Sequence, residues 1–363
     1  MFAPNYRITP AIAKALMSVE ADRHAVIELP IDIAMLASLK ETAMLAATHY
    51  STQIEGNRLT QAQVQETLSG ASFPGRERDV TEVRNYYRAI EEVERLSALS
   101  VPVAEIDIQS IHGLVLNGRL TPSPYRDGQN VIRDSLSGGI VYMPPEAQDV
   151  PILMAELVTW INAAIDLEEL PSPIIAAVTH YQYATIHPYY DGNGRTARLI
   201  TTLILHKLGY GLKGVYNLEE YYAQDLSAYY NAIAVGPSHN YYLGRMEAEI
   251  TGFITYFCQG MARSFSAVRA QAVQASRRGA SDRSSMLRHL DPRKRRLLSL
   301  FHDQGTATAQ EIAAHLGLSP RTVTALCREW LSDGFLTVRD PSRKNRSYRL
   351  GPEYDKLAEG ANI

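Results

Sequence analysis

Apolar residues recur every three or four positions along most of the first 275 residues, and this spacing predicts a mainly helical protein. The clearest apolar stripe lies within residues 31–50, where Ile33, Leu36, Leu39 and Ala43 share one face of a helix. The same reasoning predicts further helices at Thr60–Leu68, Arg78–Leu99, Ile106–Asn117, Pro151–Ile165, Pro173–Ile186, Thr196–Leu208, Leu218–Ala234 and Tyr241–Ala275.

Residues 121–145 interrupt this helical pattern, because Gly, Pro, Asp and Ser replace the apolar stripe. Two short β-like runs, Asn130–Ile132 and Ile140–Tyr142, flank the tripeptide Ser137-Gly138-Gly139, which is typical of a hairpin turn. We therefore expect one small β-hairpin between the helices.

A different pattern begins near residue 290. Thr308 and Glu311 have the spacing of a capping box, which predicts a short helix at Ala309–Leu316. Gly317 then makes a turn, and Ser319-Pro320 begins a second helix at Arg321–Leu331. Two short helices around such a turn are typical of a helix-turn-helix.

Two strand-like runs follow these helices. Phe335–Val338 and Ser347–Leu350 enclose a basic loop at Asp340–Arg346. Together with the preceding helices they predict a winged helix over residues 290–351.

A chain of 363 residues is expected to contain two or three domains, because domains usually have roughly 100–200 residues. Ser276–Ser285 is rich in Arg, Gly, Ser and Asp and has the composition of a linker. We therefore predict an N-terminal helical region at residues 1–104, a helical core with an extension at 105–275, and a winged helix at 286–352.

Charge is distributed unevenly along the chain. Residues 277–349 contain 15 Lys and Arg against 7 Asp and Glu, a net charge of +8, and the remainder of the chain carries −11. A basic module on an acidic body indicates different partners for the two parts, and nucleic acid is the first candidate for the basic part. A solvated basic face that binds nothing is the alternative.

Composition narrows the protein class further. Hydrophobic residues make up 45% and charged residues 21%, which is ordinary for a soluble globular protein and excludes a mainly disordered chain. Apolar runs such as Leu199–Leu205 are far shorter than the roughly 20 residues that cross a bilayer. Met1–Ala15 lacks the pattern of a secretory signal, and Cys258 and Cys327 cannot form a disulfide framework. We therefore expect a cytoplasmic protein without a membrane partner.

The most informative stretch is residues 187–198, which read His-Pro-Tyr-Tyr-Asp-Gly-Asn-Gly-Arg-Thr-Ala-Arg and form a polar loop between two predicted helices. Helix N-termini present unpaired N–H groups and a partial positive charge, so they attract phosphate. Gly192 and Gly194 let the main chain approach a ligand closely. Arg195 and Arg198, three positions apart, add two cations on one side of the first helical turn.

Two further residues of this loop suit phosphate chemistry. Asp191 offers the hard oxygen ligand that Mg²⁺ takes beside substrate phosphates. His187 is a base that titrates near neutral pH at the entrance to the loop. Each residue alone is also typical of an ordinary turn or of a structural histidine, so the joint order is the informative feature. That order predicts a polyphosphate cradle with a metal ligand and a base beside it.

The loop resembles the signature of the Fic family, His-Pro-Phe-x-Asp/Glu-Gly-Asn-Gly-Arg-x-x-Arg. It matches at every specified position except Tyr189, where Phe is usual. That aromatic normally packs into the core, so Tyr189 adds a hydroxyl that needs a partner. The resemblance covers roughly residues 30–260. It implies a Fic-type helical core with a β-hairpin flap, here Ile140–Pro145, followed by a helix at Val150–Trp160.

Most Fic proteins move AMP from ATP to a hydroxyl of a target protein and release pyrophosphate, and the resemblance implies this adenylyltransferase activity here. By position, His187 would take the proton of the incoming Ser, Thr or Tyr hydroxyl, and Asp191 would hold Mg²⁺ at the α- and β-phosphates. Arg195 would neutralise the leaving pyrophosphate, and Arg198 would hold the γ-phosphate. The remaining phosphate-binding residues implied are Gly192, Asn193, Gly194 and Thr196.

The flap offers an exposed strand edge, to which a segment of the target protein would add as a further strand. Val141 and Tyr142 of the flap complete the nucleotide-binding residues, together with Tyr229 and Tyr230, which match a tyrosine pair beside the adenine in the family. Core packing is an equally good interpretation of this pair, because tyrosines are frequent in the region.

A second match concerns regulation. Ser51-Thr52-Gln53-Ile54-Glu55-Gly56-Asn57 ends the helix that begins near Ile31, and Gly56 suits the left-handed residue past a helix end. The string also matches the Fic inhibitory motif, Ser/Thr-x-x-x-Glu-Gly/Asn. In that family the Glu pairs with the second Arg of the signature, here Arg198, and blocks productive placement of the γ-phosphate. We therefore expect Ser51, Glu55 and Gly56 to inhibit the site.

The winged helix adds a candidate DNA interface. We expect its second helix to expose Arg321, Thr322, Thr324 and Arg328, and its wing to carry Arg343, Lys344 and Arg346. Protein contact or dimerisation is the alternative use of such a domain.

Three functions stay open at this point. The first is an adenylyltransferase held back by Glu55, with ATP, Mg²⁺ and a target protein, including the protein itself, as its partners. The second is an enzyme that removes AMP, alone or in addition. The third is a DNA-binding regulator whose Fic domain senses nucleotide. A homodimer is also open, and His49, His180 and His206 are interpreted as packing residues.

Overall fold

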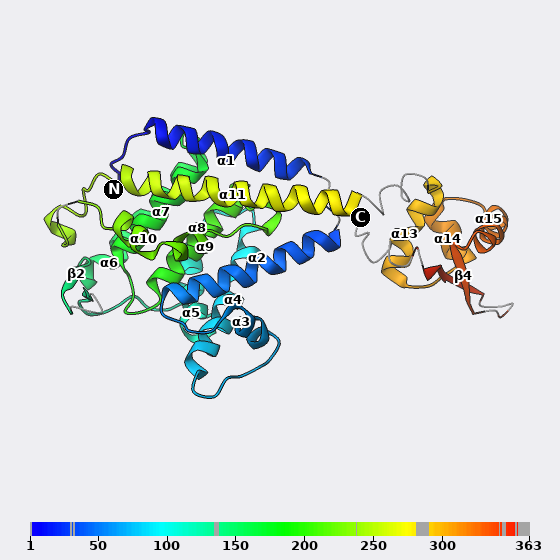
Figure 1. Ribbon diagram of the computed structural model, residues 1–363, viewed down its shortest axis with the longest axis horizontal. Helices are drawn as coiled ribbons and strands as arrows, with labels where there is room; N and C mark the ends of the chain where they lie inside the picture. Colours follow the sequence, from blue (N-terminus) through cyan, green and yellow to red (C-terminus); the bar gives the residue numbers. More distant parts are fainter. Residues whose placement is uncertain are drawn as a thin grey trace. The chain divides into compact units, whose positions relative to one another are not determined.

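The computed structural model describes residues 2–29, 31, 33–133, 138–236, 238–280, 290–340, 342, 346–352 and 354 (Figure 1). Most of these residues are helical, which confirms the predicted mainly α class. The chain forms two compact units, which are described separately. The first consists of Met1–Glu28 with Lys40–Ala270, and the second of Leu29–Leu39 with Gln271–Ile363. The three predicted domain boundaries stay predictions.

Five helices form the N-terminal part, and four of them agree with the sequence pattern. They are α1 (Pro10–Glu28), α2 (Ile33–Ile54), α3 (Gln61–Leu68), α4 (Glu77–Ser97) and α5 (Glu105–Asn117). We did not predict α1. Its buried residues, Ile12, Ala15, Val19, Asp22 and Val26, recur every three or four positions. One of them is a charged aspartate, and the apolar residues Met17 and Ile27 lie outside this face and point to solvent, which obscures the pattern in the sequence.

The centre of the first unit is formed by α6 (Val150–Leu167), α7 (Ser172–Ile186) and α8 (Asn193–Lys207). Helix α7 is buried on all sides, and this agrees with a sequence that has apolar residues on every face of the helix. Helices α4 and α5 pack against α8 through an apolar cluster that includes Tyr86 and Leu199. This packing fixes the start of α8, where the signature loop ends.

Helix α6 with the short helix η1 (Ala147–Asp149) forms an apolar segment, Ala147–Leu167, that is long enough by length and composition to cross a membrane. Its buried residues, among them Met154, Leu157 and Ile161, recur every three or four positions, and α6 packs against α7. That is the pattern of a helix with one face against a protein core. The expected absence of a membrane partner stays a prediction.

The predicted flap is present as a short antiparallel hairpin. Strand β1 (Ile132–Arg133) pairs with β2 (Ile140–Tyr142), and Ile132 lies opposite Tyr142. Of the predicted turn, Gly138 and Gly139 are described, and Ser137 lies outside the described residues.

The segment after α8 differs from the prediction in two places. The helix predicted at 218–234 is divided into α9 (Glu219–Gln224) and α10 (Leu226–Ile233), because Asp225 leaves the helical conformation and caps α10 through the Ala228 N–H. The last helix, α11 (Thr251–Ala280), begins ten residues later than predicted. It follows two short helices, η2 (Leu212–Gly214) and η3 (Tyr241–Leu243).

Helix α11 also overturns part of the predicted linker. Residues 276–280 are helical in main-chain conformation, and the remainder of the linker falls outside the described residues. Arg and Ala are good helix formers, so the composition of this stretch does not by itself end a helix.

The C-terminal module is a helix-turn-helix with a small sheet, as predicted. Its elements are α13 (Pro292–Gln304), β3 (Ala307–Thr308), α14 (Ala309–Leu316), α15 (Pro320–Ser332), β4 (Leu336–Asp340) and β5 (Ser347–Leu350). The strands lie in the order β3-β5-β4, all antiparallel. Thr308 and Ser319 cap α14 and α15, and Trp330 and Phe335 pack in the core. Strand β3 was not predicted, because two residues carry too little pattern.

Candidate functional site

The signature loop connects α7 to α8 through two residues in the left-handed conformation. His187 follows the end of α7 with a φ of 51°, and Gly192 precedes α8 with a φ of 77°. Helix α8 begins at Asn193, three residues earlier than predicted, so Gly194 lies within its first turn. The Thr196 N–H closes that turn on Gly192 O at 3.0 Å. The earlier N–H groups of the turn are therefore directed toward the loop and suit an anion.

Asn193 holds the loop in shape. Its Oδ1 accepts a hydrogen bond from the Tyr189 N–H at 3.0 Å, and its Nδ2 donates to Tyr189 O at 2.8 Å. The side chain is buried. We had expected this amide to bind phosphate, whereas the structure uses both of its ends to close the loop on itself.

Tyr189 and His112 form the support beneath the loop. Their rings stack with centroids 3.5 Å apart and planes 8° from parallel. His112 Nε2 lies 2.9 Å from Asp191 O, and the Tyr189 hydroxyl donates to Ser123 O at 3.5 Å. The hydroxyl that distinguishes Tyr189 from the usual Phe therefore has a partner. We missed His112 because a single buried histidine on an apolar helix has no sequence signal of its own.

His187 is held as a neutral base. Burial lowers its pKa to about 4, so the imidazole is unprotonated at neutral pH. Its Nδ1 lies 3.4 Å from Ala184 O. A proton on Nδ1 directed at this carbonyl leaves the lone pair on Nε2, which is the atom that would accept a proton.

Arg195 and Asp191 lie together at the start of α8. Arg195 Nη2 donates to Asp191 Oδ1 at 3.2 Å, and Arg195 Nη1 is 3.8 Å from Glu82 Oε1 on α4. The Gly192 N–H also donates to Asp191 Oδ1 at 2.6 Å. The Arg195 side chain is buried, whereas that of Asp191 is 55% exposed. Glu82, which lies outside the motif, was not predicted.

The residues of the inhibitory motif meet Arg198. Arg198 Nε donates to Ser51 Oγ at 2.7 Å and Nη2 donates to Ser51 O at 3.0 Å. The same Nη2 lies 2.9 Å from Glu55 Oε1. Gly56, with a φ of 93°, lies just past the end of α2, as predicted.

The Arg198 guanidinium is nearly inaccessible to solvent, with 1% of its side chain exposed. Burial is the largest single influence on the pKa of Arg198 and lowers it, but the Glu55 carboxylate, Tyr229 and Tyr86 together raise it, so the net direction is upward. The Glu55 carboxylate also lies against Gly194, where an added Cβ would overlap Glu55 Oε1 and stand 3.3 Å from Arg198 Nη1. Glu55 therefore sits directly on the first turn of α8.

Three other predicted nucleotide residues differ in accessibility. Thr196 is fully buried, so its side chain faces the core rather than a ligand. Tyr229 is also buried, and its hydroxyl lies 2.9 Å from His180 Nε2. Tyr230 is 50% exposed. Core packing is thus the better description of Tyr229, and Tyr230 is the member of the pair that a ligand can reach.

The histidines interpreted as packing residues have specific partners. His180 also bonds Thr201 through Nδ1 at 2.9 Å, and burial lowers its pKa to about 3. His206 Nδ1 lies 2.9 Å from Glu94 Oε1. His49 is half-buried, and its ring packs beside that of Tyr50.

The flap exposes one face of its second strand and anchors the other face to the core. Val141 is 41% exposed, whereas Tyr142 is buried and its hydroxyl donates to Thr185 O near the end of α7 at 2.7 Å. The two flap residues predicted to bind nucleotide therefore differ: Val141 faces solvent, and Tyr142 ties the flap to the core.

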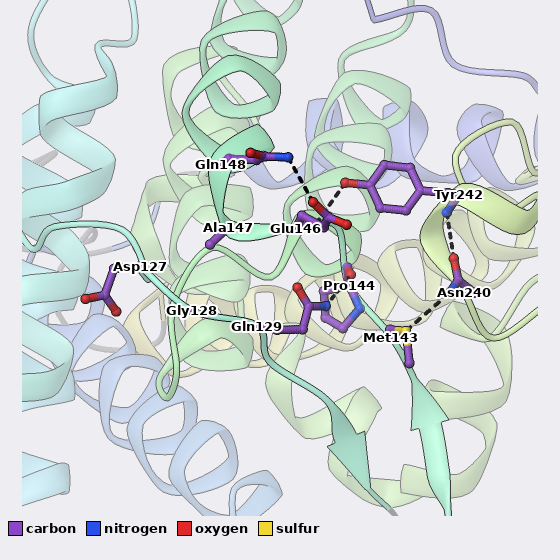
Figure 2. A pocket seen from close by; sticks show the side chains of 10 residues that line it. All are labelled: Asp127, Gly128, Gln129, Met143, Pro144, Glu146, Ala147, Gln148, Asn240 and Tyr242. Carbon is purple, nitrogen blue, oxygen red and sulfur yellow. Dashed lines mark hydrogen bonds between the residues drawn. The ribbon is translucent and has the colours of Figure 1, made fainter.

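A pocket of about 500 Å³ lies beside the base of the flap (Figure 2). It is lined by the loop at Asp127–Gln129, by Met143 and Pro144 of the flap, by Glu146, Ala147 and Gln148, and by Asn240 and Tyr242. Gln129 Nε2 donates to Pro144 O at 3.0 Å, which ties two of these walls together. The exposed Tyr190 of the signature donates to Asp127 Oδ1 at 2.8 Å, so this pocket adjoins the signature loop.

The donor set at the loop fits Mg²⁺ that is held mainly by phosphate oxygens. Among the described residues, no three His, Cys, Asp or Glu side chains gather as a protein cage for a metal. The partly exposed Asp191 supplies one hard carboxylate, and Mg²⁺ commonly takes one or two carboxylates with substrate phosphates and water.

The fold and this site define a helical domain with a helix N-terminus whose first turn suits an anion, a neutral imidazole in the preceding loop, and a carboxylate paired with the second arginine of the signature. Residues 102–205 match the model of the Fic/DOC family, and residues 293–346 match a helix-turn-helix domain model. Residues 102–205 thus form a Fic-type domain, and residues 293–346 form a helix-turn-helix domain.

Relatives with curated names agree with this assignment. The chain is 28% identical over 199 residues to the protein adenylyltransferase Fic of Drosophila erecta, covering 54% of this chain and 39% of that protein. It is 29% identical over 199 residues to the protein of the same name from Drosophila grimshawi, covering 54% and 40%. The chain therefore spans about two fifths of the length of these relatives.

Solved structures share the fold. A Fic family protein from Desulfovibrio desulfuricans G20 has a TM-score of 0.60 at 23% identity, covering 97% of this chain and 99% of that one. A Fic domain containing signaling protein from Bacteroides thetaiotaomicron VPI-5482 has a TM-score of 0.61 at 23% identity, covering 72% and 97%. Fic-1 from C. elegans has a TM-score of 0.58 at 24% identity, covering 74% and 73%.

Proposed function

We propose that this chain is a protein adenylyltransferase that transfers AMP from ATP to a Ser, Thr or Tyr hydroxyl of a target protein, and that Glu55 inhibits it. The observation that carries the proposal is that the triphosphate and the Glu55 carboxylate would both bind at the N-terminus of α8. The first turn of α8 and its arginines suit a triphosphate, and Glu55 lies 2.9 Å from Arg198 at that same turn.

In the proposed reaction the hydroxyl oxygen of the target attacks the α-phosphorus of ATP. The bond from the α-phosphorus to the α–β bridging oxygen breaks, and pyrophosphate leaves. The hydroxyl proton passes to Nε2 of His187, which is neutral because burial lowers its pKa to about 4. A correctly placed general base contributes on the order of 10²–10⁴ in rate.

Stabilisation of the phosphate charge is the second contribution to the proposed catalysis. Arg195 is held by Asp191 and Glu82, so its cation is fixed before substrate arrives, as electrostatic catalysis requires. Arg198 would bind the γ-phosphate once Glu55 leaves. Mg²⁺ bound at Asp191 would neutralise phosphate charge during the transfer.

Inhibition follows from competition for one guanidinium. Arg198 has its Nε directed at Ser51 Oγ and its Nη2 shared between Ser51 O and Glu55. A γ-phosphate that pairs with this guanidinium must displace the Glu55 carboxylate, and the two anions repel each other if both remain. ATP would then bind without productive alignment for as long as Glu55 stays in place.

Labelled nucleotide tests the reaction class. Glu55→Gly protein is incubated with a candidate target and with ATP labelled at either the α- or the γ-phosphate. We expect the α label alone to become covalently attached, together with release of pyrophosphate. Attachment of the γ label would instead indicate phosphate transfer. Loss of the α label from a target modified beforehand, without any addition, would identify the protein as an enzyme that removes AMP.

We further propose that the C-terminal module binds duplex DNA. The buried face of α15 carries Val323, Cys327 and Trp330, and the opposite face is polar. All four predicted contact residues of this helix are exposed, namely Arg321, Thr322, Thr324 and Arg328. The Thr322 hydroxyl also forms a hydrogen bond with the Ser319 hydroxyl in the helix cap. Arg346 lies beside Tyr348 of β5, whereas Arg343 and Lys344 lie outside the described residues.

Salt dependence tests this second function. Replacement of Arg321 and Arg328 by Ala should weaken binding to duplex DNA and reduce the dependence of affinity on salt concentration by about one to two phosphate contacts. Binding that is absent at low salt, or unaffected by both substitutions, would exclude this use of α15.

A further inference from the structure

Arg126 is a buried cation whose hydrogen bonds are directed at the main chain of three separate segments. Its Nε donates to His187 O at 3.0 Å, and its Nη1 donates to Gly128 O at 3.0 Å. Its Nη2 donates to Pro145 O at the end of the flap, and its own N–H donates to Pro188 O at 3.0 Å. The residue as a whole is 3% exposed.

Each of these carbonyls belongs to a part of the site with a different task. His187 carries the base, Pro145 ends the flap that presents a strand edge, and Gly128 lies in the wall of the pocket beside the flap (Figure 2). A planar guanidinium fixes the directions of its N–H donors, so it can hold three acceptors in one arrangement. A lysine ammonium keeps the charge but does not impose that geometry.

The backbone at His187 needs such a constraint. Its φ of 51° is in the left-handed region, which residues other than glycine adopt at an energetic cost. The carbonyl that Arg126 holds belongs to this same residue. A hydrogen bond at this point therefore restrains the strained main chain from which the imidazole projects.

We propose that Arg126 is a positioning residue that holds the base of His187 and the flap in one fixed relation. The proposal rests on the proposed AMP transfer, which assigns the hydroxyl proton to His187, and on the expectation that a segment of the target adds to the flap as a strand. Because Arg126 bonds both the flap and the main chain of His187, a target strand that docks on the flap presents its hydroxyl to an imidazole that is already positioned. The sequence offers no signal for this role, since the residue lies in a loop rich in Gly, Pro and Asp.

The first test measures catalysis in the Glu55→Gly protein. Addition of Arg126→Lys should lower kcat for AMP transfer at least tenfold while the Kd for ATP with Mg²⁺ changes less than twofold. Arg84→Lys serves as the matched control, because Arg84 also donates to two main-chain carbonyls, Thr67 O and Ala71 O, far from the signature loop along the chain. A kcat within twofold of the parent would overturn the proposal.

The second test does not depend on activity. Amide hydrogen exchange is compared between the wild-type, Arg126→Lys and Arg84→Lys proteins without nucleotide. Exchange should accelerate together in the flap, residues 140–146, and in the loop at 187–192, with α7 and α8 unchanged. Acceleration in only one segment, or throughout α7 and α8, would contradict a positioning role.

These results separate the two proposals. If Glu55→Gly protein transfers no AMP, the proposed function fails, and the exchange measurement alone decides whether Arg126 links the flap to the loop. Arg126→Gln, which reaches fewer carbonyls, provides a second variant. If neither variant folds while Arg84→Lys does, Arg126 is a requirement of the fold and the positioning proposal is overturned.

Discussion

Glu55 Oε1 lies 2.9 Å from Nη2 of Arg198, and this ion pair joins the end of α2 to the beginning of α8. The guanidinium is almost fully buried, whereas the carboxylate is 26% exposed. Glu55 is thus the more accessible partner of the pair. A pocket of about 290 Å³ adjoins Glu55 and offers space beside its carboxylate. Its lining also includes Gly56, Arg58, residues 75–79 and Glu82.

Glu55→Gln separates the charge of this pair from its shape. We expect the free energy of unfolding to fall by about 1–3 kcal/mol, because the buried Arg198 loses its counter-charge. AMP transfer should rise at the same time, since an amide competes less well with the γ-phosphate. Urea unfolding and transfer from α-labelled ATP measure the two effects. Glu66→Gln, on the exposed face of α3, should change neither quantity.

Gly194→Ala tests how closely Glu55 approaches α8. The added Cβ would overlap Glu55 Oε1, so the substitution should destabilise the wild-type protein by about 1–3 kcal/mol. In the Glu55→Gly protein the overlapping atom is absent, and the same substitution should cost much less. A double-mutant cycle of unfolding free energies checks this coupling. Additive effects would mean that the Glu55 carboxylate does not rest on Gly194.

Acid should destabilise the protein through its buried histidines. Burial lowers the pKa to about 4 for His112 and to about 3 for His180, below the value of about 6.5 in an unfolded chain. The unfolded chain then binds more protons, so stability is complete above pH 6.5 and is lost as the pH falls toward 4. Each fully titrating imidazole contributes about 1.4 kcal/mol per pH unit in that window.

The contribution of His180 is measurable by substitution. His180→Gln should flatten the dependence of unfolding free energy on pH between 6.5 and 4. Equal slopes for His180→Gln and the wild-type protein would show that His180 binds its proton equally well in the folded and unfolded states, which contradicts a pKa lowered by burial.

The residues of the two motifs could be identified from the sequence because each motif places several side chains in a fixed local order. His187, Asp191, Arg195 and Arg198 lie in one loop and the helix that follows it, so their proximity follows from their spacing. The contact of Glu55 with Arg198 joins distant parts of the chain, and only the resemblance to the Fic family indicated it. The structure places these two side chains in contact.

Other parts of the site depend on tertiary contacts that spacing does not specify. Asn193 was expected at phosphate, but the loop geometry directs its amide to Tyr189. Thr196 lies on the face of α8 that packs into the core. Arg126 and His112 bond main-chain carbonyls that are distant in the sequence. Every residue type has such a carbonyl, so the sequence does not reveal which residue is the acceptor.

The most direct measurement is the intact mass of the Glu55→Gly protein after incubation with ATP and Mg²⁺. The account predicts a gain of one AMP per modified hydroxyl, which is absent when His187→Ala is added and weak in the wild-type protein. An unchanged mass, with a candidate target protein also unmodified, would contradict it, as would an equal gain in the protein that lacks the His187 imidazole.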